Sequence, residues 1–165
     1  ANRNKNKSTF ASDIIGDWTD GKYPIRLDFD GNYSWIITEK YSIINNDTLN
    51  FEYDVCKRIA GTTGIKAIWQ ADYGEGFLLN FTFGRYNYYT YEWSDNYNGG
   101  GTYSVENDEL TLIENRGSFK CVGNIFTYTT PDGHPHHGKC SVKDDKLTIT
   151  FMGQLPIVYT RIPLV

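Results

Sequence analysis

Apolar and polar residues alternate with a period of two along most of this chain. In IRLDF, residues 25–29, isoleucine, leucine and phenylalanine alternate with charged residues, and DGN at 30–32 then predicts a tight turn. In FLLNFTF, residues 77–83, Phe77, Leu79, Phe81 and Phe83 share one face, and Asn80 and Thr82 lie on the other. Such alternation is typical of antiparallel strands with one buried face. The pattern therefore predicts an all-β protein.

The helical signal is confined to the beginning of the chain. The stretch STFASDII, residues 8–15, predicts a short N-terminal helical turn with Ser8 as its cap, which ends before Gly16. Elsewhere, DFDGN at 28–32 resembles a calcium-binding loop. Because strand patterns flank it, whereas helices flank an EF-hand loop, we interpret it as a hairpin turn. NGGG at 98–101 indicates a flexible loop.

One motif occurs three times along the chain. It reads YSIINNDTLNFEY at 41–53, YSVENDELTLIE at 103–114 and CSVKDDKLTITF at 140–151. Acidic and amide residues tolerate the positive φ of a short hairpin turn, so each copy predicts a hairpin. With an aromatic strand before each copy, the chain contains about eight to ten strands in sequence order. Closure into a single up-and-down antiparallel β-barrel would remove both unpaired sheet edges.

Composition narrows the partners that this protein can have. The 165 residues suit one domain, and 16% of them are aromatic. The formal charge of −4 gives no basic field, which argues against nucleic acid as a partner. No apolar run approaches the roughly 20 residues of a transmembrane helix. We find neither a nucleophile elbow nor a phosphate-binding loop, so we predict no catalytic residue and no cofactor.

The N-terminus favours an exported protein, although a sequence cut at this point from a longer chain would look the same. The sequence begins ANRNKNK without an initiator methionine, and these polar and basic residues offer nothing to bury. We therefore interpret residues 1–8 as a disordered tether and residues 9–165 as the folded domain. A tether would suit a periplasmic, cell-surface or secreted protein, including a lipoprotein anchored at its N-terminus.

Three cysteines, Cys56, Cys121 and Cys140, allow at most one internal disulfide. If the hairpin between Cys121 and Cys140 turns near DGHPHHG, Cys140 lies opposite Tyr128. Cys121 is then about seven residues, or roughly 23 Å, further along its strand. A regular hairpin would keep these two cysteines apart, and pairing with Cys56 stays open.

Both ends of the domain resemble the lipocalins and their calycin relatives. IIGDW at 14–18 is similar to the Gly-x-Trp motif that opens the first lipocalin strand, and VYTRI at 158–162 is similar to the closing strand. The whole pattern resembles the lipocalin-like domains of bacterial exported proteins over residues 10–163. The resemblance implies a cation–π contact between Trp18 and Arg161 at the closed end of a barrel. The Thr-Asp-Tyr motif of kernel lipocalins is absent from the sequence.

A barrel of this size is wide enough to hold one small ligand, so we expect non-catalytic binding of an apolar or amphipathic molecule. In NYYTYEW, residues 87–93, aromatic residues occupy both faces of one strand, which is more aromatic surface than one core needs. The predicted ligand-binding residues are Trp35, Phe81, Phe83, Tyr89, Tyr91, Trp93, Tyr103 and Phe126.

Two other function classes stay open. A lipocalin-fold enzyme of the isomerase or cyclase type could use Glu92, Asp95 or a histidine as acid or base. A packed interior would instead favour a surface module whose exposed tyrosines bind a glycan or a protein. We predict no metal site, although the loop PDGHPHHGK offers His134, His136 and His137 as candidate ligands.

Overall fold

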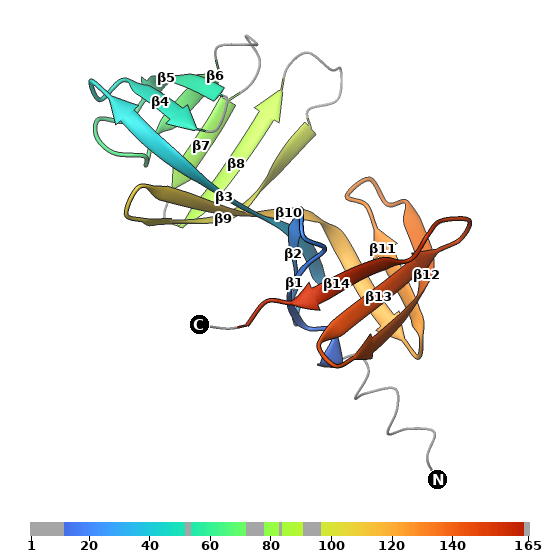
Figure 1. The fold of residues 1–165 in the computed structure, drawn as a ribbon. Helices are drawn as coiled ribbons and strands as arrows, with labels where there is room; N and C mark the ends of the chain where they lie inside the picture. The colour runs from blue at the N-terminus through green and yellow to red at the C-terminus, as the bar shows by residue number, and fades with distance from the viewer. Residues whose placement is uncertain (1–11, 52–53, 72–77, 83, 91–96, 164–165) are drawn as a thin grey trace. The chain divides into compact units, whose positions relative to one another are not determined.

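The computed structural model describes residues 12–51, 54–71, 78–82, 84–90 and 97–163. Within these ranges, fourteen β-strands follow one another along the chain. Each strand hydrogen-bonds antiparallel to the next, and β14 pairs with β1, so that the described strands form one closed ring (Figure 1). The predicted all-β, antiparallel fold with strands in sequence order is confirmed.

The predicted number of strands is wrong, because fourteen strands replace the expected eight to ten. Two short strands, at 54–60 and 68–71, lie in a part of the chain for which the sequence pattern predicted no strand. In addition, Gly84 lies in a turn between the paired strand residues 78–82 and 85–90, and Gly123 lies in a turn between the paired strand residues 118–122 and 125–129.

Internal contacts divide the chain into two compact units, which we call unit 1 (residues 1–36 and 115–165) and unit 2 (residues 37–114). Unit 1 contains β1 (Gly16–Thr19), β2 (Pro24–Leu27), β11 (Ile125–Thr129), β12 (Pro135–Lys143), β13 (Lys146–Phe151) and β14 (Ile157–Arg161). Unit 2 contains β4 (Thr48–Phe51), β5 (Asp54–Ala60), β6 (Ile68–Ala71), β7 (Leu78–Thr82), β8 (Arg85–Thr90) and β9 (Tyr97–Glu106). The long strands β3 (Asn32–Ile44) and β10 (Glu109–Val122) contribute residues to both units.

Strands β3 and β10 also pair with each other, which closes a smaller ring within each unit. In unit 1, the Phe119 N–H donates to the Gly31 carbonyl at 2.8 Å. In unit 2, the Tyr41 N–H donates to the Asp108 carbonyl at 2.9 Å. Six complete strands and one segment each of β3 and β10 therefore give eight strand segments per unit.

The three repeated motifs form the hairpins β3–β4, β9–β10 and β12–β13, as predicted. Their turns use positive φ, which amide and acidic side chains tolerate. The residues concerned are Asn45, Asn46, Asn107, Asp144 and Asp145.

Each of these turns also holds the next strand of its ring. The carbonyls of Asp47, Asp108 and Asp145 accept backbone hydrogen bonds of 2.8, 2.9 and 2.9 Å. The donors are the N–H groups of Arg58, Tyr41 and Arg161, respectively. The repetition thus gives the same turn-to-strand connection three times.

Alternating side chains fill each unit with its own core. In unit 2, the buried aromatic and aliphatic residues are Leu49, Phe51, Trp69, Leu79, Phe81, Tyr86, Leu110 and Leu112, with Cys56, Ala67 and Ala71. In unit 1, they are Ile14, Trp18, Ile25, Leu27, Phe126, Leu147 and Ile149, with Cys140. Phe29, by contrast, is exposed because β2 ends at Leu27 and the turn begins at Asp28.

The NGGG stretch belongs to strand β9 and is not a loop, which corrects the expectation from its composition. Gly100 pairs with Asn87 on β8 and has a φ of +153°. A Cβ at this position would lie 2.3 Å from the Tyr86 carbonyl oxygen. Glycine is needed here because the β8 backbone leaves no space for a side chain.

The expected N-terminal helical turn lies mostly outside the described residues. Its described end shows one turn-type hydrogen bond, from the Ile15 N–H to the Ser12 carbonyl at 3.3 Å. No helix is assigned as an element in the described part of the chain.

Candidate functional site

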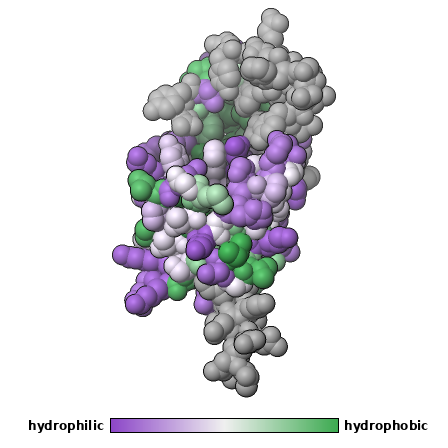
Figure 2. All heavy atoms as spheres, turned by 90° about the vertical axis from the view of Figure 1, so that its right-hand side faces the viewer, coloured by the Kyte–Doolittle hydropathy of each residue, from purple (hydrophilic) through white to green (hydrophobic). Residues whose placement is uncertain are grey.

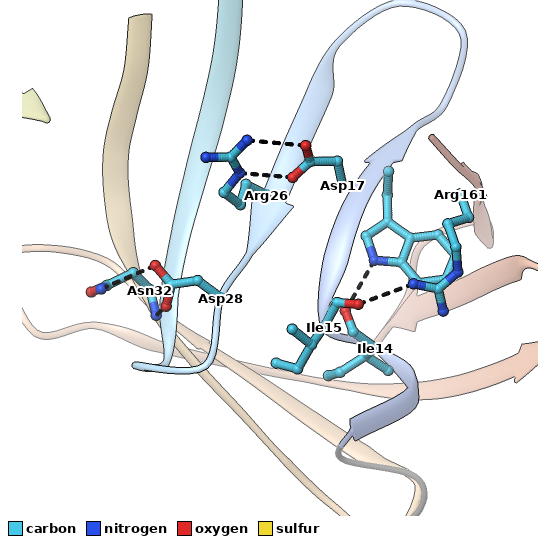
Figure 3. A network of polar contacts seen from close by, with 8 residues as sticks. Ile14, Ile15, Asp17, Arg26, Asp28, Asn32 and Arg161 are labelled. Atoms are coloured by element: carbon cyan, nitrogen blue, oxygen red, sulfur yellow. Dashed lines mark hydrogen bonds and ion pairs between the residues drawn. The ribbon is translucent and has the colours of Figure 1, made fainter. Parts of the chain in front are cut away.

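Trp18 and Arg161 form the contact that the lipocalin resemblance implies. They lie directly opposite each other on β1 and β14, with the guanidinium carbon 4.2 Å from the ring centroid. The Trp18 indole N–H donates to the Ile14 carbonyl at 3.0 Å. Arg161 donates to the Ile15 carbonyl at 3.0 Å (Figure 3) and to the Asp13 carbonyl at 2.6 Å. The guanidinium is thus held by backbone oxygens above a buried indole.

Gly16 leaves space for this arrangement. A Cβ on Gly16 would lie 2.8 Å from a guanidinium nitrogen of Arg161. A side chain here would displace the Arg161 guanidinium from its present position, and the φ of +142° at Gly16 also favours glycine.

A second contact of the same kind is present in unit 2, where sequence reasoning did not find it. Arg58 on β5 pairs with Trp69 on β6, with its guanidinium 4.4 Å from the ring centroid. The Trp69 indole N–H donates to the Ile65 carbonyl four residues earlier, at 3.0 Å. Arg58 also donates to the Gly64 carbonyl at 2.9 Å. We call the two arrangements the Arg161–Trp18 lock and the Arg58–Trp69 lock, and both stabilise strand pairing.

The candidate binding site is a pocket of about 470 Å³ in unit 1, which we call the aromatic pocket. It is lined by Tyr128, Pro135, His136, His137, Phe151, Met152 and Gln154. Tyr128 and Phe151 also pack against the core of unit 1, so the pocket adjoins that core. Its volume lies within the range of small-molecule sites.

Contacts between rings order one wall of the aromatic pocket. Tyr128 stacks on His136 at a centroid distance of 5.8 Å, and it also meets Tyr33, in a tilted arrangement, at 4.8 Å. The Tyr128 hydroxyl donates to the Arg116 carbonyl at 2.9 Å, which fixes the ring. This wall offers flat aromatic surface with imidazole nitrogens at its edge, which suits an amphipathic ligand.

A second hollow, of about 420 Å³, adjoins the aromatic pocket. Both are lined by His137, Phe151, Met152 and Gln154, and the second extends to Ile125 and Lys139. On the face of the molecule in Figure 2, hydrophobic residues form small groups among hydrophilic ones. Because the described residues form no broad apolar surface on this face, the two pockets are the better candidates for ligand binding.

Burial raises the pKa of Tyr33 and Tyr159, which pack against the core of unit 1. The pKa of Tyr159 rises to about 12, chiefly because desolvation disfavours the phenolate, and the neighbouring Tyr33 adds to the effect. Burial likewise raises the pKa of Tyr33. These hydroxyls stay neutral at physiological pH.

The three histidines have separate partners. His134 pairs with Asp132 at 2.9 Å, His136 stacks on Tyr128, and His137 Nδ1 lies 3.0 Å from the Thr127 hydroxyl. The pKa of Asp132 is lowered, chiefly because its carboxylate accepts a hydrogen bond from the Thr130 hydroxyl. No group of three potential metal ligands occurs among the described residues.

The predicted ligand wall is divided between the two units. Phe81 and Tyr103 meet edge to face in unit 2, with centroids 5.0 Å apart, and Phe81 is buried in the core. In unit 1, Phe126 is buried, whereas Trp35 is 39% exposed and lies beneath Arg116, 4.1 Å from its guanidinium. Phe83, Tyr91, Trp93 and the side chain of Tyr89 lie outside the described part.

The remaining acidic candidates separate into two groups. Glu92 and Asp95, proposed for an enzyme, also lie outside the described residues. The Asp28 carboxylate accepts hydrogen bonds from the backbone N–H groups of Asp30 and Asn32, both at 2.9 Å. It forms the β2–β3 hairpin turn, as predicted in preference to a calcium loop.

The expectation that Cys121 and Cys140 are far apart is wrong, because their Sγ atoms lie 3.3 Å from each other. Two features explain the error. Thr129 pairs with Pro135, so the β11–β12 turn is centred earlier than assumed and Cys140 lies beside Asn124. Residues 123–124 also form a turn of their own, which folds Cys121 back alongside β11.

Sequence reasoning missed most residues of the aromatic pocket. Phe151 closes a repeated hairpin that we interpreted as purely structural, and Met152 follows it in the turn. Tyr128 alternates with Phe126 in the sequence, which is a signal that could have found it. The histidine loop was noticed, but as a candidate metal site.

Comparison with protein-family models, with curated proteins and with solved structures finds no match for this chain. Among the residues that the structure describes, no helix has the length and apolar character needed to span a membrane.

Proposed function

We propose that this protein binds a small apolar or amphipathic molecule, without catalysing its conversion, in the aromatic pocket of unit 1. The carrying observation is a pocket of about 470 Å³ whose wall includes the stacked rings of Tyr128 and His136 and adjoins the core of unit 1. Burial of ligand surface there would supply about 25 cal/mol per Å², before the costs of association.

The lipocalin-like pattern at both ends of the domain supports this proposal, because lipocalin barrels commonly carry small apolar molecules. Our proposal places the ligand at a pocket of one unit, instead of in the interior of a single barrel. Export to the periplasm, cell surface or medium belongs to the same proposal and rests on the sequence of residues 1–8.

The test uses N-phenyl-1-naphthylamine, a neutral probe that fluoresces when it enters an apolar site. Met152 lines the pocket and is 95% exposed, so Met152→Glu puts a charge in the site without disturbing the core. Leu155→Glu is the matched control, since Leu155 is 86% exposed and lies outside the lining. We expect saturable binding that Met152→Glu weakens about tenfold, on the scale of 1.4 kcal/mol per decade, and Leu155→Glu leaves unchanged.

Two results would overturn the proposal. Saturable binding that both substitutions leave unchanged would show that the probe binds elsewhere. A complete lack of binding would favour the surface module that recognises a glycan or a protein.

A further inference from the structure

Cys121 and Cys140 form a close thiol pair within unit 1. Their Sγ atoms are 3.3 Å apart, whereas sulfurs in a disulfide are about 2.05 Å apart. The Cys140 N–H donates to the Asn124 carbonyl at 2.9 Å, which fixes β12 beside the β10–β11 turn. Cys121 Sγ lies 3.7 Å from the Gly123 carbonyl of the same turn. The backbone thus holds the two thiols beside each other, and a disulfide would form if the sulfurs approached by about 1 Å or a little more.

We propose that Cys121 and Cys140 are a redox-active dithiol, which a small-molecule disulfide oxidises to an intramolecular disulfide and a thiol reductant reopens. The closed bond would link β10 to β12 across β11. This inference concerns a modification site and is independent of ligand binding.

The two thiols differ in access and in acidity. Cys121 is partly exposed, whereas Cys140 is 4% exposed. A hydrogen bond from Cys140 lowers the pKa of Cys121, and the same interaction, with burial, raises the pKa of Cys140. The thiolate is the nucleophilic form, so Cys121 is the thiol that attacks an external disulfide.

With oxidised glutathione as the oxidant, the reaction balances in two steps. The Cys121 thiolate attacks one sulfur, forms a mixed disulfide and displaces one glutathione thiolate. Cys140, after loss of its proton, attacks Cys121 Sγ and displaces the second glutathione thiolate. The protein loses two electrons and two protons, and oxidised glutathione becomes two molecules of reduced glutathione.

The third cysteine provides an internal control. Cys56 is fully buried in the core of unit 2, so an external disulfide cannot reach it while that unit is folded. Oxidation of the folded protein should therefore consume two thiols and leave the third.

The experiment equilibrates the full chain with mixtures of reduced and oxidised glutathione, followed by acid quenching, alkylation under denaturing conditions and mass spectrometry. We expect the oxidised protein to carry one alkyl group, on Cys56, and to yield a cross-linked peptide of Cys121 and Cys140. Reduction should restore three alkyl groups. Cys56→Ser should leave the cross-link unchanged.

Single substitutions test the order of attack. Cys140→Ser should trap one glutathione on Cys121, because no second thiol resolves the mixed disulfide. Cys121→Ser should acquire no glutathione, because Cys140 is buried. The proposal is overturned if the wild type stops at the mixed disulfide, if Cys56 enters the cross-link, or if three thiols persist in excess oxidised glutathione.

Discussion

The Arg161–Trp18 lock predicts a large loss of stability when Arg161 is replaced by methionine. Methionine keeps apolar contact with the indole but removes the charge and the donor groups. Four interactions are lost: the cation–π contact at 4.2 Å, two hydrogen bonds to backbone carbonyls, and the ion pair with Asp145.

The magnitude follows from the burial of each interaction. Trp18 is fully buried, so the cation–π contact contributes about 1–2 kcal/mol. Each charge-assisted hydrogen bond contributes about 1.5 kcal/mol at the lower end of its range, since the Arg161 side chain is 30% exposed. The Asp145 side chain is 76% exposed, so its ion pair adds about 0.5 kcal/mol or less. Methionine packing restores part of this, which leaves a net loss of about 3 kcal/mol.

Urea unfolding followed by tryptophan fluorescence measures this loss. With an m-value of about 2 kcal/mol/M, the unfolding midpoint should fall by about 1.5 M. Arg26→Met is the control, because Arg26 also binds a carboxylate, that of Asp17 at 2.8 Å, but its side chain is 42% exposed. That substitution should cost about 1 kcal/mol or less. The reasoning is refuted if Arg161→Met shifts the midpoint no more than Arg26→Met does.

Three further predictions use the same unfolding assay. Arg58→Met should destabilise the protein by about 2–3 kcal/mol through the second lock, and hydrogen exchange should increase first in unit 2; an increase confined to unit 1 would contradict this. Gly100→Ala should lower the free energy of unfolding by more than about 2 kcal/mol, because its Cβ would clash with a backbone carbonyl. Gly123→Ala, where φ is positive but space is open, should lower it by about 1 kcal/mol. Equal losses would contradict the close approach of β8 and β9. The folded-state pKa of Tyr159, about 12, exceeds its unfolded value near 10, so the contribution of Tyr159 to stability should be constant below pH 10 and fall between pH 10 and 12 as only the unfolded chain releases the proton. Tyr159→Phe should lessen that fall, and an unchanged slope would show that other groups cause it.

The local rules of hairpin formation were readable in the sequence. Asparagine and aspartate at the repeated turns have positive φ, and the alternation of Leu147 and Ile149 with polar residues placed both side chains in the core. Antiparallel pairing in sequence order followed, because each turn is too short for any other connection.

Features that depend on close approach between strands were not readable. In the sequence, Gly123 fits either a turn or the first residue of a strand. It lies in a turn, and because the sequence did not show this, Cys121 was placed too far from Cys140. The glycines at 99–101 resemble a loop by composition, but they pair with β8, whose backbone excludes a side chain at Gly100. Pairing of β3 with β10 depends on contacts far apart in sequence, which periodicity does not encode.

The two locks explain what the repeated hairpins contribute beyond their turns. In unit 2, the arginine strand follows its hairpin directly, and the tryptophan strand comes next in the chain. In unit 1, the arginine strand is β14 and the tryptophan strand is β1, so the same spatial order is joined through the two ends of the domain. The third hairpin, β9–β10, makes the same turn-to-strand hydrogen bond, but its recipient is Tyr41 instead of an arginine. In every copy, the hairpin motif therefore aligns the next strand of a ring through a backbone hydrogen bond. Once in each unit, the aligned residue is an arginine that faces a tryptophan, and the two side chains form a lock.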